Sequence, residues 1–330
     1  MKSPKRPLFA LLSLALFAST LSACSSNTAS DDATNDQSAS SVEQTSEPAP
    51  PPISAQAAEV TPAEEPGTFA KDSNTLVFGV VPDSVDTETN YQPLMNYIAA
   101  KTGMQVEYRE STDYAALIEA AVAGKIDVAS FSGFTYVIAT TQGANLLPVS
   151  SIITVQGEEP GYYSQAVVAK DSPIQKLDEF KGKKVCFVDP SSTSGYLFPS
   201  YNLLNLGIDP EKDITPVFAG KHDVSVTKTV EGRECEAGFA EDSEVTKKAD
   251  ELRIIESTHV PGAPIVISGN LPSSVQELLR SALTSVSIDD MIAQGVEGAD
   301  SESFAAIMYA LSPVDDSAYD IIRDICAKTG

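Results

Sequence analysis

Residues 183–207, KKVCFVDPSSTSGYLFPSYNLLNLG, place an apolar run, a polar turn and an amphipathic run in direct succession. The apolar run 184–188 predicts a buried strand, and the run from 196 to the glycine at 207 predicts a helix. Strand, turn and helix in this order form the repeating unit of an α/β fold. In such folds ligands bind beyond the carboxyl ends of the strands, which is where the turn DPSSTSG lies.

The same unit recurs along the chain and predicts two α/β lobes, each a mostly parallel sheet with flanking helices. Strands are expected at 75–81, 104–110, 126–132, 146–155, 164–170, 183–189, 214–220, 234–240, 252–258 and 264–269. Helices are expected between these strands, and two more follow them, at 272–286 and 301–325.

The return of an apolar strand at 264–269 after the second series of units predicts that the chain goes back to the first sheet. Residues 74–167 and 262–330 are therefore assigned to the first lobe, and residues 168–261 to the second. Two hinge segments, near 165–170 and 258–265, would cross between the lobes. A ligand would then bind in the cleft between them.

The N-terminus predicts export and a lipid anchor. Three basic residues precede the apolar run LFALLSLALFA, which is followed by Leu-Ser-Ala and Cys24. Residues 1–23 read as a signal peptide, and the cysteine resembles that of a bacterial lipoprotein, cleaved before Cys24 and acylated there. The alternative is an ordinary secretory signal. Residues 24–73, rich in Ser, Pro, Ala and Glu, predict a disordered acidic tether, so the protein would lie at the outer face of the cytoplasmic membrane.

Charge and cysteine content exclude several classes of function. The 330 residues carry a net charge of −24, which disfavours binding to nucleic acid. The cysteines beyond Cys24 are Cys186, Cys235 and Cys326, and their spacing fits no metal site; no cofactor is expected either. We predict a disulfide between Cys186 and Cys235, on two strands of one lobe, with Cys326 left over. The alternative is that no disulfide forms.

Three consecutive hydroxyls in the turn predict an anion site. A helix N-terminus offers free N–H groups and a partial positive charge. Ser192, Thr193 and Ser194 would add three donors, and Gly195 would let a ligand approach the backbone. The alternative is helix capping, for which a single hydroxyl is enough.

Three further side chains are candidates for the same site. His222, one of only two histidines, follows a predicted strand and can donate to an anion in either protonation state. Tyr114 and Tyr162 belong to the first lobe and would face the turn across the cleft. The alternatives are a capping or surface histidine and two tyrosines packed in the core.

Five segments together resemble the phosphate-, phosphite- and phosphonate-binding proteins of ABC transporters. They are DYAALIEAAVAGKIDVASFSG (113–133), PGYYS (160–164), KDSPIQKLDEFKGKKVCFVDPSSTSGYLFP (170–199), FAGKHD (218–223) and VPGAPIVI (260–267). The resemblance implies a two-lobed periplasmic-binding-protein fold of type II. It also implies that the Ser-Thr-Ser turn, the histidine and the two tyrosines hold the phosphonyl oxygens of the ligand.

One departure from the family bears on the ligand. Members that bind aminoethylphosphonate place carboxylates near the amine, at positions that align with Ser243 and Ala263 here. Asp242 lies beside the first position and is a second candidate for the site, together with Ser243. We therefore expect a ligand without an amine, such as phosphite, phosphate or a small phosphonate.

The predicted function is that of a monomeric substrate-binding lipoprotein that delivers its ligand to an ABC permease. A hydrolase built on Ser194, His222 and Asp242 is disfavoured because the nucleophile elbow G-x-S-x-G is absent, so no enzyme is expected. The remaining alternative is a ligand receptor that docks on a membrane sensor kinase.

Overall fold

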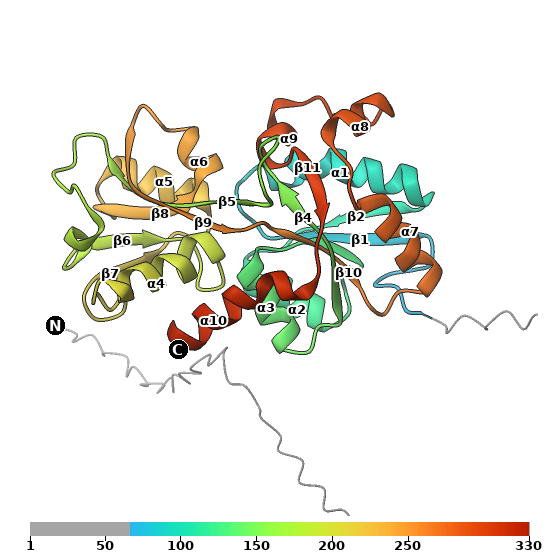
Figure 1. Ribbon diagram of the computed structural model, residues 1–330, viewed down its shortest axis with the longest axis horizontal. Coiled ribbons are helices and arrows are strands. Elements are labelled where there is room, and N and C mark those ends of the chain that lie inside the picture. Colours follow the sequence, from blue (N-terminus) through green and yellow to red (C-terminus); the bar gives the residue numbers. More distant parts are fainter. Residues whose placement is uncertain (1–66, 330) are drawn as a thin grey trace, which may run out of the picture.

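The computed structural model describes residues 67–329 and has two lobes that share one mixed sheet (Figure 1). In the first lobe the strand order is β2-β1-β3-β10-β4, and β11 also pairs with β4. The pairs β1–β2 and β1–β3 are parallel, whereas β10 and β11 are antiparallel to their partners. These strands are β1 (Thr75–Val80), β2 (Gln105–Arg109), β3 (Val128–Ser130), β4 (Leu146–Ile153), β10 (Pro264–Ser268) and β11 (Ala310–Pro313).

The second lobe continues the sheet in the order β5-β8-β6-β7, with β9 paired to β5. Strand β6 is parallel to β7 and β8, and β5 is antiparallel to β8 and β9. The strands are β5 (Gly161–Ala169), β6 (Lys184–Phe187), β7 (Thr215–Phe218), β8 (Ala237–Glu241) and β9 (Leu252–Pro261). Each lobe therefore has a parallel core with antiparallel neighbours, and the predicted α/β class is confirmed.

Helices cover both faces of each part of the sheet. Those of the first lobe are α1 (Thr87–Thr102), α2 (Tyr114–Val122), α3 (Gly133–Thr141), α7 (Ser273–Leu283), α8 (Ile288–Ala293), α9 (Glu302–Ile307) and η3 (Asp316–Tyr319). Those of the second are η1 (Leu177–Phe180), η2 (Thr193–Leu197), α4 (Phe198–Asn205), α5 (His222–Glu231) and α6 (Asp242–Thr246).

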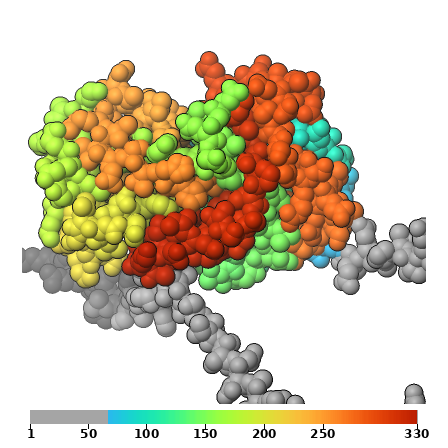
Figure 2. Space-filling model, in the orientation of Figure 1, coloured from blue at the N-terminus to red at the C-terminus, as the bar shows by residue number. Residues whose placement is uncertain are grey.

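The chain passes between the lobes beside the junction of β4 with β5, which pair only at Ile153 and Gly161, and again between β9 and β10. The C-terminal helix α10 (Asp320–Thr329) adds a third link, because it contacts α3 in one lobe and α4 in the other. In the space-filling view α10, in red, lies along the lower edge of both lobes (Figure 2). One apolar cluster is shared by the lobes, since Leu197 and Phe198 pack with Tyr114 and Ile322.

Two details of the sequence prediction change. The helix expected at 301–325 is interrupted by β11, because Leu311 is buried and pairs with β4, and this tertiary contact overrides the local helical pattern. Pro199 would lie inside the helix expected from 196 to 207, but that helix, α4, begins at Phe198, so the proline falls in its first turn, where a missing N–H costs nothing.

The end of the predicted tether is folded against the first lobe. The Thr68 N–H donates to the Asn270 carbonyl at 2.6 Å, and the Ala70 N–H donates to the buried Asp127 carboxylate at 2.8 Å. Residues 67–73 are thus held by specific hydrogen bonds, which corrects the expectation of disorder for that short part. The predicted signal peptide and Cys24 lie outside the described residues. Within residues 67–329, no helix has both the length and the apolar character to cross a bilayer.

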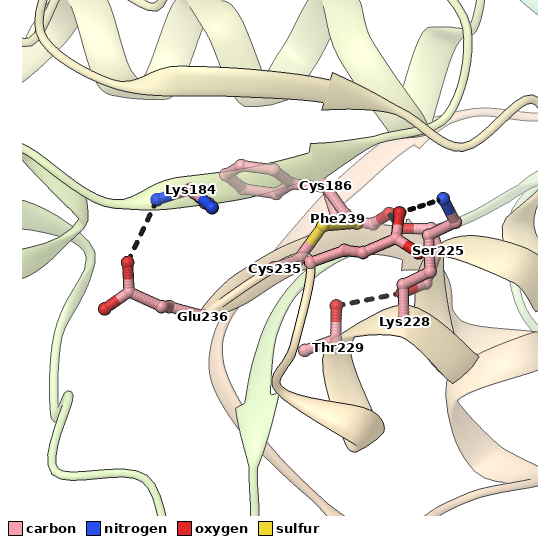
Figure 3. Close-up of a disulfide and its surroundings, with 9 residues drawn as sticks. Lys184, Cys186, Ser225, Lys228, Thr229, Cys235, Glu236 and Phe239 are labelled. Carbon is pink, nitrogen blue, oxygen red and sulfur yellow. Dashed lines mark hydrogen bonds and ion pairs between the residues drawn. A yellow bond between two sulfur atoms is a disulfide. The ribbon is translucent and has the colours of Figure 1, made fainter.

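The predicted disulfide is confirmed. Cys186 on β6 and Cys235 just before β8 form a fully buried bridge with a Cα–Cα distance of 5.5 Å (Figure 3). The bridge ties β6 to the segment that leads into its parallel neighbour β8. Cys326, which we expected to be left over, is buried on α10 and is not a free thiol, since the described residues contain no free cysteine.

Candidate functional site

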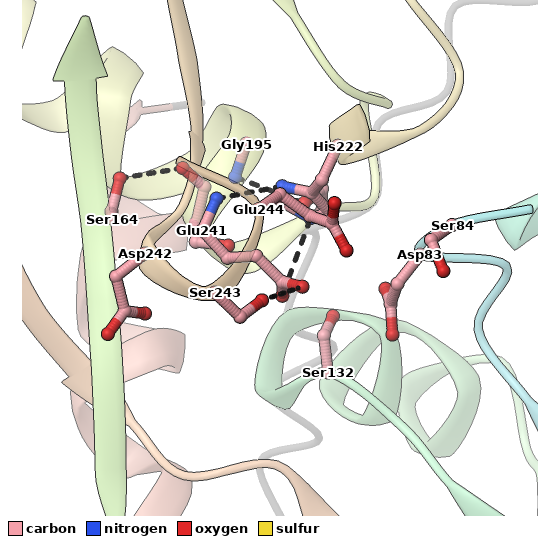
Figure 4. Close-up of polar contacts among 12 residues, drawn as sticks. Asp83, Ser84, Ser132, Ser164, Gly195, His222, Glu241, Asp242, Ser243 and Glu244 are labelled. Carbon is pink, nitrogen blue, oxygen red and sulfur yellow. Dashed lines mark hydrogen bonds and ion pairs between the residues drawn. The ribbon is translucent and has the colours of Figure 1, made fainter. Parts of the chain in front are cut away.

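The carboxyl ends of strands from both lobes converge on one cavity of about 360 Å³. Asp83 follows β1 and Ser132 follows β3 in the first lobe, while His222 follows β7 and Glu241 ends β8 in the second. This is the position at which open α/β sheets bind ligands. Figure 4 shows Asp83 and Ser84 facing His222, Glu241 and Glu244 across the space between the lobes.

The polar turn after β6 folds as a wide π-type turn. The Ser192 hydroxyl caps it by accepting the Gly195 N–H at 3.0 Å, and the Leu197 N–H donates to the Ser192 carbonyl at 3.0 Å, five residues back. Such single π turns are common at functional sites. Because Ser192 uses a lone pair for the cap, its hydroxyl proton remains available as a donor.

The three hydroxyl side chains of the turn are buried at the junction of the lobes. The Thr193 Oγ1 accepts the Phe134 N–H of the first lobe at 2.8 Å, so its proton is also free. The Ser194 carbonyl accepts from the Ser164 hydroxyl at 2.6 Å. The turn lies beside the cavity rather than in its wall, and the predicted ligand groups that line the wall are Tyr162 and His222.

Gly195 has a different role from the one expected. A Cβ at this position would come within 2.4 Å of the Val188 side chain and 2.9 Å of the Ser192 Oγ. Glycine is therefore needed so that the turn can pack against the end of β6. It does not line the cavity wall, which corrects the prediction that it lets a ligand approach.

Both predicted tyrosines approach the hydroxyl turn, but Tyr162 does so from β5 of the second lobe and not across the cleft from the first lobe, which corrects the prediction. Tyr114, fully buried, donates from its hydroxyl to the Asp83 Oδ1 at 3.0 Å and lies close to Ser192. Tyr162 lies close to Ser194 and Thr193. Burial raises the pKa of both phenols well above the usual value, so both keep their protons; the proton of Tyr114 is donated to Asp83, whereas that of Tyr162 forms no such bond to a carboxylate of the described residues.

His222 is buried and neutral. Desolvation lowers the pKa of its imidazole to about 4, against the opposing effect of nearby carboxylates. Its Nδ1 accepts the Glu241 N–H at 2.9 Å, so the single ring proton belongs on Nε2. The ring therefore offers a neutral N–H donor at the cavity.

Four carboxylates, but no lysine or arginine, are among the residues that line this cavity; they are Asp83, Glu241, Asp242 and Glu244. Desolvation raises the pKa of Glu241 to about 7, although the Ser243 hydroxyl donates to its Oε1 at 2.8 Å and acts in the opposite direction. Asp242 accepts the Tyr163 N–H at 3.0 Å, and in Figure 4 its carboxylate points away from His222.

Asp83, His222 and Glu241 place one possible metal-ligand atom each within 4.8 Å of one another. The hydrogen bond at Nδ1 opposes a metal ion here, because the Nε2 that would bind it carries the ring proton. The neutral N–H instead suits an oxygen atom of an anion.

The lobes are closed onto each other at this site. The backbone N–H of His222 donates to the backbone carbonyl of Asp83 at 3.0 Å, and the Lys221 Nζ donates to the Ser84 carbonyl at 3.2 Å. On the other side of the turn, the Thr135 hydroxyl donates to the Ser191 carbonyl at 3.0 Å. The groups predicted to bind a ligand thus take part in, or adjoin, the contacts that close the cleft.

The structure brings together all six residues predicted for the site, namely Tyr114, Tyr162, Ser192, Thr193, Ser194 and His222. Ser243 lines the cavity as well. Sequence reasoning missed Asp83, which follows the predicted strand 75–81, and Ser132, which ends the predicted strand 126–132, although the same carboxyl-end rule would have found them. It also missed the wall formed by Ala305 and Ala306 of α9, for which the sequence contains no local signal.

Comparisons with known proteins agree with this arrangement. Residues 78–319 match the family described as ABC transporter, phosphonate, periplasmic substrate-binding protein. The phosphate-import protein PhnD of Mycolicibacterium smegmatis is 33% identical over 277 residues, covering 78% of this chain and 86% of that protein. A binding protein component of an ABC phosphonate transporter from Pseudomonas aeruginosa has a TM-score of 0.67 at 24% identity, covering 78% of this chain and 88% of that one. PhnD1 from Prochlorococcus marinus, solved with methylphosphonate, also gives 0.67, at 18% identity over 77% and 98% of the two chains.

Proposed function

Because this chain belongs to the family of periplasmic phosphonate-binding proteins of ABC transporters, we propose that it captures a small phosphorus oxyanion between its lobes and presents it to a permease. The ligand class is phosphite, phosphate or a small phosphonate. The protein carries out no reaction on it, and binding is read out as closure of the cleft.

The observation that carries the proposal is the set of neutral donors at the lobe junction, with Tyr162 and His222 in the cavity wall and the hydroxyl turn beside it. Ser192, Thr193 and Ser194 contribute hydroxyls from one lobe, and Tyr162 reaches them from the adjoining strand. His222 adds its Nε2–H. Donors fixed in a dry site stabilise a charged acceptor by about 1.5–3 kcal/mol each, so no cation is needed to hold a tetrahedral anion.

We infer that the ligand has no amine, because Ala263 stands where an acid is expected for an aminoalkyl group. Ala263 lines the cavity and cannot pair with an ammonium. The carboxylates of Asp83 and Glu241, however, also face the cavity and are able to pair with an ammonium group. Aminoethylphosphonate is therefore the ligand with which the amine-free ligands have to be compared. A direct comparison of affinities therefore decides this point.

The test is calorimetric titration of the purified exported chain with phosphite, phosphate, methylphosphonate and aminoethylphosphonate, with sulfate as the control anion. We expect one of the three amine-free ligands to bind most tightly. Absence of binding by all four phosphorus compounds would refute the proposed function. Tightest binding of aminoethylphosphonate would refute only the inference about the amine.

We further propose that the mature protein is a monomer anchored by acylation of Cys24 at the outer face of the cytoplasmic membrane. The lipoprotein-like motif and the acidic segment that follows it support this location. Mass spectrometry of the N-terminal peptide, together with fractionation of a Cys24→Ser variant, tests it. Release of wild-type protein into the soluble fraction, with an unmodified Cys24, is the contrary result.

A further inference from the structure

A receptor for an anion would not be expected to line its cavity with carboxylates, and yet two half-buried ones lie in the wall of this cavity. Asp83 comes from the loop after β1 and Glu241 from the end of β8, so each lobe contributes one. They lie within the same group of possible ligand atoms, all within 4.8 Å of one another. Two ionised carboxylates at this distance, joined by an anion, would repel one another strongly.

The hydrogen bonds around Asp83 show where a proton is missing. Tyr114 has a single hydroxyl proton, which it donates to the Asp83 Oδ1 at 3.0 Å. An anion that enters the cavity comes beside this carboxylate, which lines the wall, and so brings a second acceptor without a donor. A proton on the carboxyl group or on the ligand would satisfy both acceptors.

Glu241 is in a similar position on the other side. It accepts the Ser243 hydroxyl at Oε1, while its Oε2 lies 4.0 Å from the His222 Nε2. Nε2 carries the neutral donor of the ring, so an anion that takes this N–H is brought next to the Glu241 carboxylate. The same conflict between two negatively charged acceptors therefore arises in both lobes.

We propose that Asp83 and Glu241 form a proton-dependent selector, in which the carboxyl pair and the bound oxyanion share one acid proton. The inference rests on the proposed function and specifies the ligand further, as an oxyanion basic enough to hold part of that proton. Phosphoryl oxygens are comparable in basicity to a buried carboxylate. Sulfate is a much weaker base and cannot share the proton on equal terms.

The surroundings of the pair favour a bound proton. The titratable groups near Asp83, apart from Glu241, are Tyr91, Tyr108, Tyr114, Tyr162, Lys221, His222 and Glu244. Those near Glu241, apart from Asp83, are Tyr91, Tyr114, Tyr162, His222, Asp223, Asp242, Glu244 and Lys247. Neither set has an excess of positive charge. The pKa of Asp83 is raised well above its usual value, mainly by desolvation and secondly by the negative charge of Glu241. The pKa of Glu241 is raised to about 7.

Selectivity of this kind is large when a site is built around a ligand hydroxyl. Sites that form a hydrogen bond with the proton of a ligand hydroxyl reject analogues without that hydroxyl by about 10⁴-fold. We therefore expect methylphosphonate or phosphite to bind about 10⁴-fold more tightly than sulfate at pH 8.5. We also expect the affinity for methylphosphonate to fall about tenfold per pH unit on the alkaline side of the pair's titration, up to pH 9.5, because one proton is bound with each ligand.

The experiment compares wild type with the double variant Asp83→Asn, Glu241→Gln, which keeps the shape of both side chains. Calorimetry measures methylphosphonate and sulfate binding between pH 6 and 9.5. The double variant should lose the alkaline slope, and its preference over sulfate should fall to about tenfold. Asp86→Asn is the matched control, because Asp86 is exposed in the same loop and does not line the cavity, and it should leave both properties unchanged. Thermal unfolding confirms that each variant is folded.

Three results would overturn the selector. The first is wild-type affinity for methylphosphonate that stays constant to pH 9.5. The second is undiminished rejection of sulfate by the double variant. The third is a preference of wild type for aminoethylphosphonate over methylphosphonate that is lost in the double variant. The carboxylates would then bind an ammonium group. If no phosphorus oxyanion binds wild type at any pH, the proposed function itself fails, which is a distinguishable outcome.

Discussion

Replacing His222 by asparagine separates the two hydrogen bonds that its ring can make. The asparagine Oδ1 can take the place of Nδ1 and accept the Glu241 N–H, which now bonds to the ring at 2.9 Å. The shorter side chain has no group at the position of Nε2, so only the donor toward the ligand is lost. Alanine removes both and leaves the N–H of Glu241 buried without a partner.

The structure sets the expected magnitudes. Loss of one donor to a charged acceptor costs about 1.5–3 kcal/mol, which corresponds to an affinity about 10- to 150-fold weaker for both variants. The asparagine variant should keep the free energy of unfolding of wild type. The alanine variant should lose about 1–3 kcal/mol of it, because an amide at the lobe junction is left unsatisfied.

The neutral state of His222 gives this prediction a pH signature. Its pKa is about 4 in the folded protein and about 6.5 in the unfolded chain, so the unfolded state binds more protons between these values. The contribution of neutral His222 to stability is fully present above pH 6.5 and is lost as the pH falls toward 4, by about 3 kcal/mol in all. The raised pKa values of Asp83 and Glu241 change stability with pH in the opposite direction. The difference in the free energy of unfolding between wild type and His222→Asn therefore isolates the contribution of the histidine.

Calorimetry with the tightest ligand of the panel and urea unfolding from pH 4 to 8 measure these quantities. We expect the affinity ratio of wild type to His222→Asn to be constant from pH 5 to 8, because a neutral donor does not titrate there. A ratio that rises as the pH falls through 6.5 would mean that a charged imidazolium binds the ligand. That result would contradict both the buried neutral ring and the tautomer assigned from its hydrogen bond.

Three further predictions concern the scaffold of the site. Replacing Cys186 and Cys235 together by serine should lower the free energy of unfolding by about 4 kcal/mol, from the 49-residue separation they close, as measured by urea denaturation; an unchanged midpoint would contradict it. Gly195→Ala should destabilise the second lobe by about 1–3 kcal/mol through overpacking against β6, read as a lower melting temperature, whereas unaltered stability would mean that the turn can shift. Thr193→Val should weaken closure by about 1–3 kcal/mol, because the Phe134 N–H loses its acceptor in the opposite lobe. Small-angle scattering with saturating ligand should then detect a more open molecule. A scattering profile identical to that of wild type would refute this.

The main features of the fold could be predicted because they depend on local patterns. Alternating strands and helices indicated two α/β lobes, and the return strand at 264–269 appears as β10 within the first sheet. The disulfide could be predicted because both cysteines belong to one lobe. Strand β11 could not, because residues 310–313 adopt their conformation only by pairing with β4, and no local pattern records that partner.

The site was predictable to the extent that it obeys one rule. Residues 192–194 and His222 follow strands, and the carboxyl-end rule identified them. The rule applies equally to Asp83, which was overlooked because a carboxylate is not an expected component of an anion site. The wall from α9 is different, because the chain returns over the cavity only through the pairing of β11 with β4.

In the proposed site, recognition and closure would use the same residues, which would explain how a cavity lined by no lysine or arginine signals occupancy. The His222 N–H bonds the Asp83 carbonyl of the opposite lobe, while its ring donor faces the cavity. Thr193 accepts the Phe134 N–H of the opposite lobe, while its hydroxyl proton remains available. A ligand that orders either side chain therefore also orders a contact between lobes. Neutral donors would suffice in such a site, because each ligand contact also stabilises the closed form. Reopening at the permease would break the ligand contacts and the contacts between the lobes together.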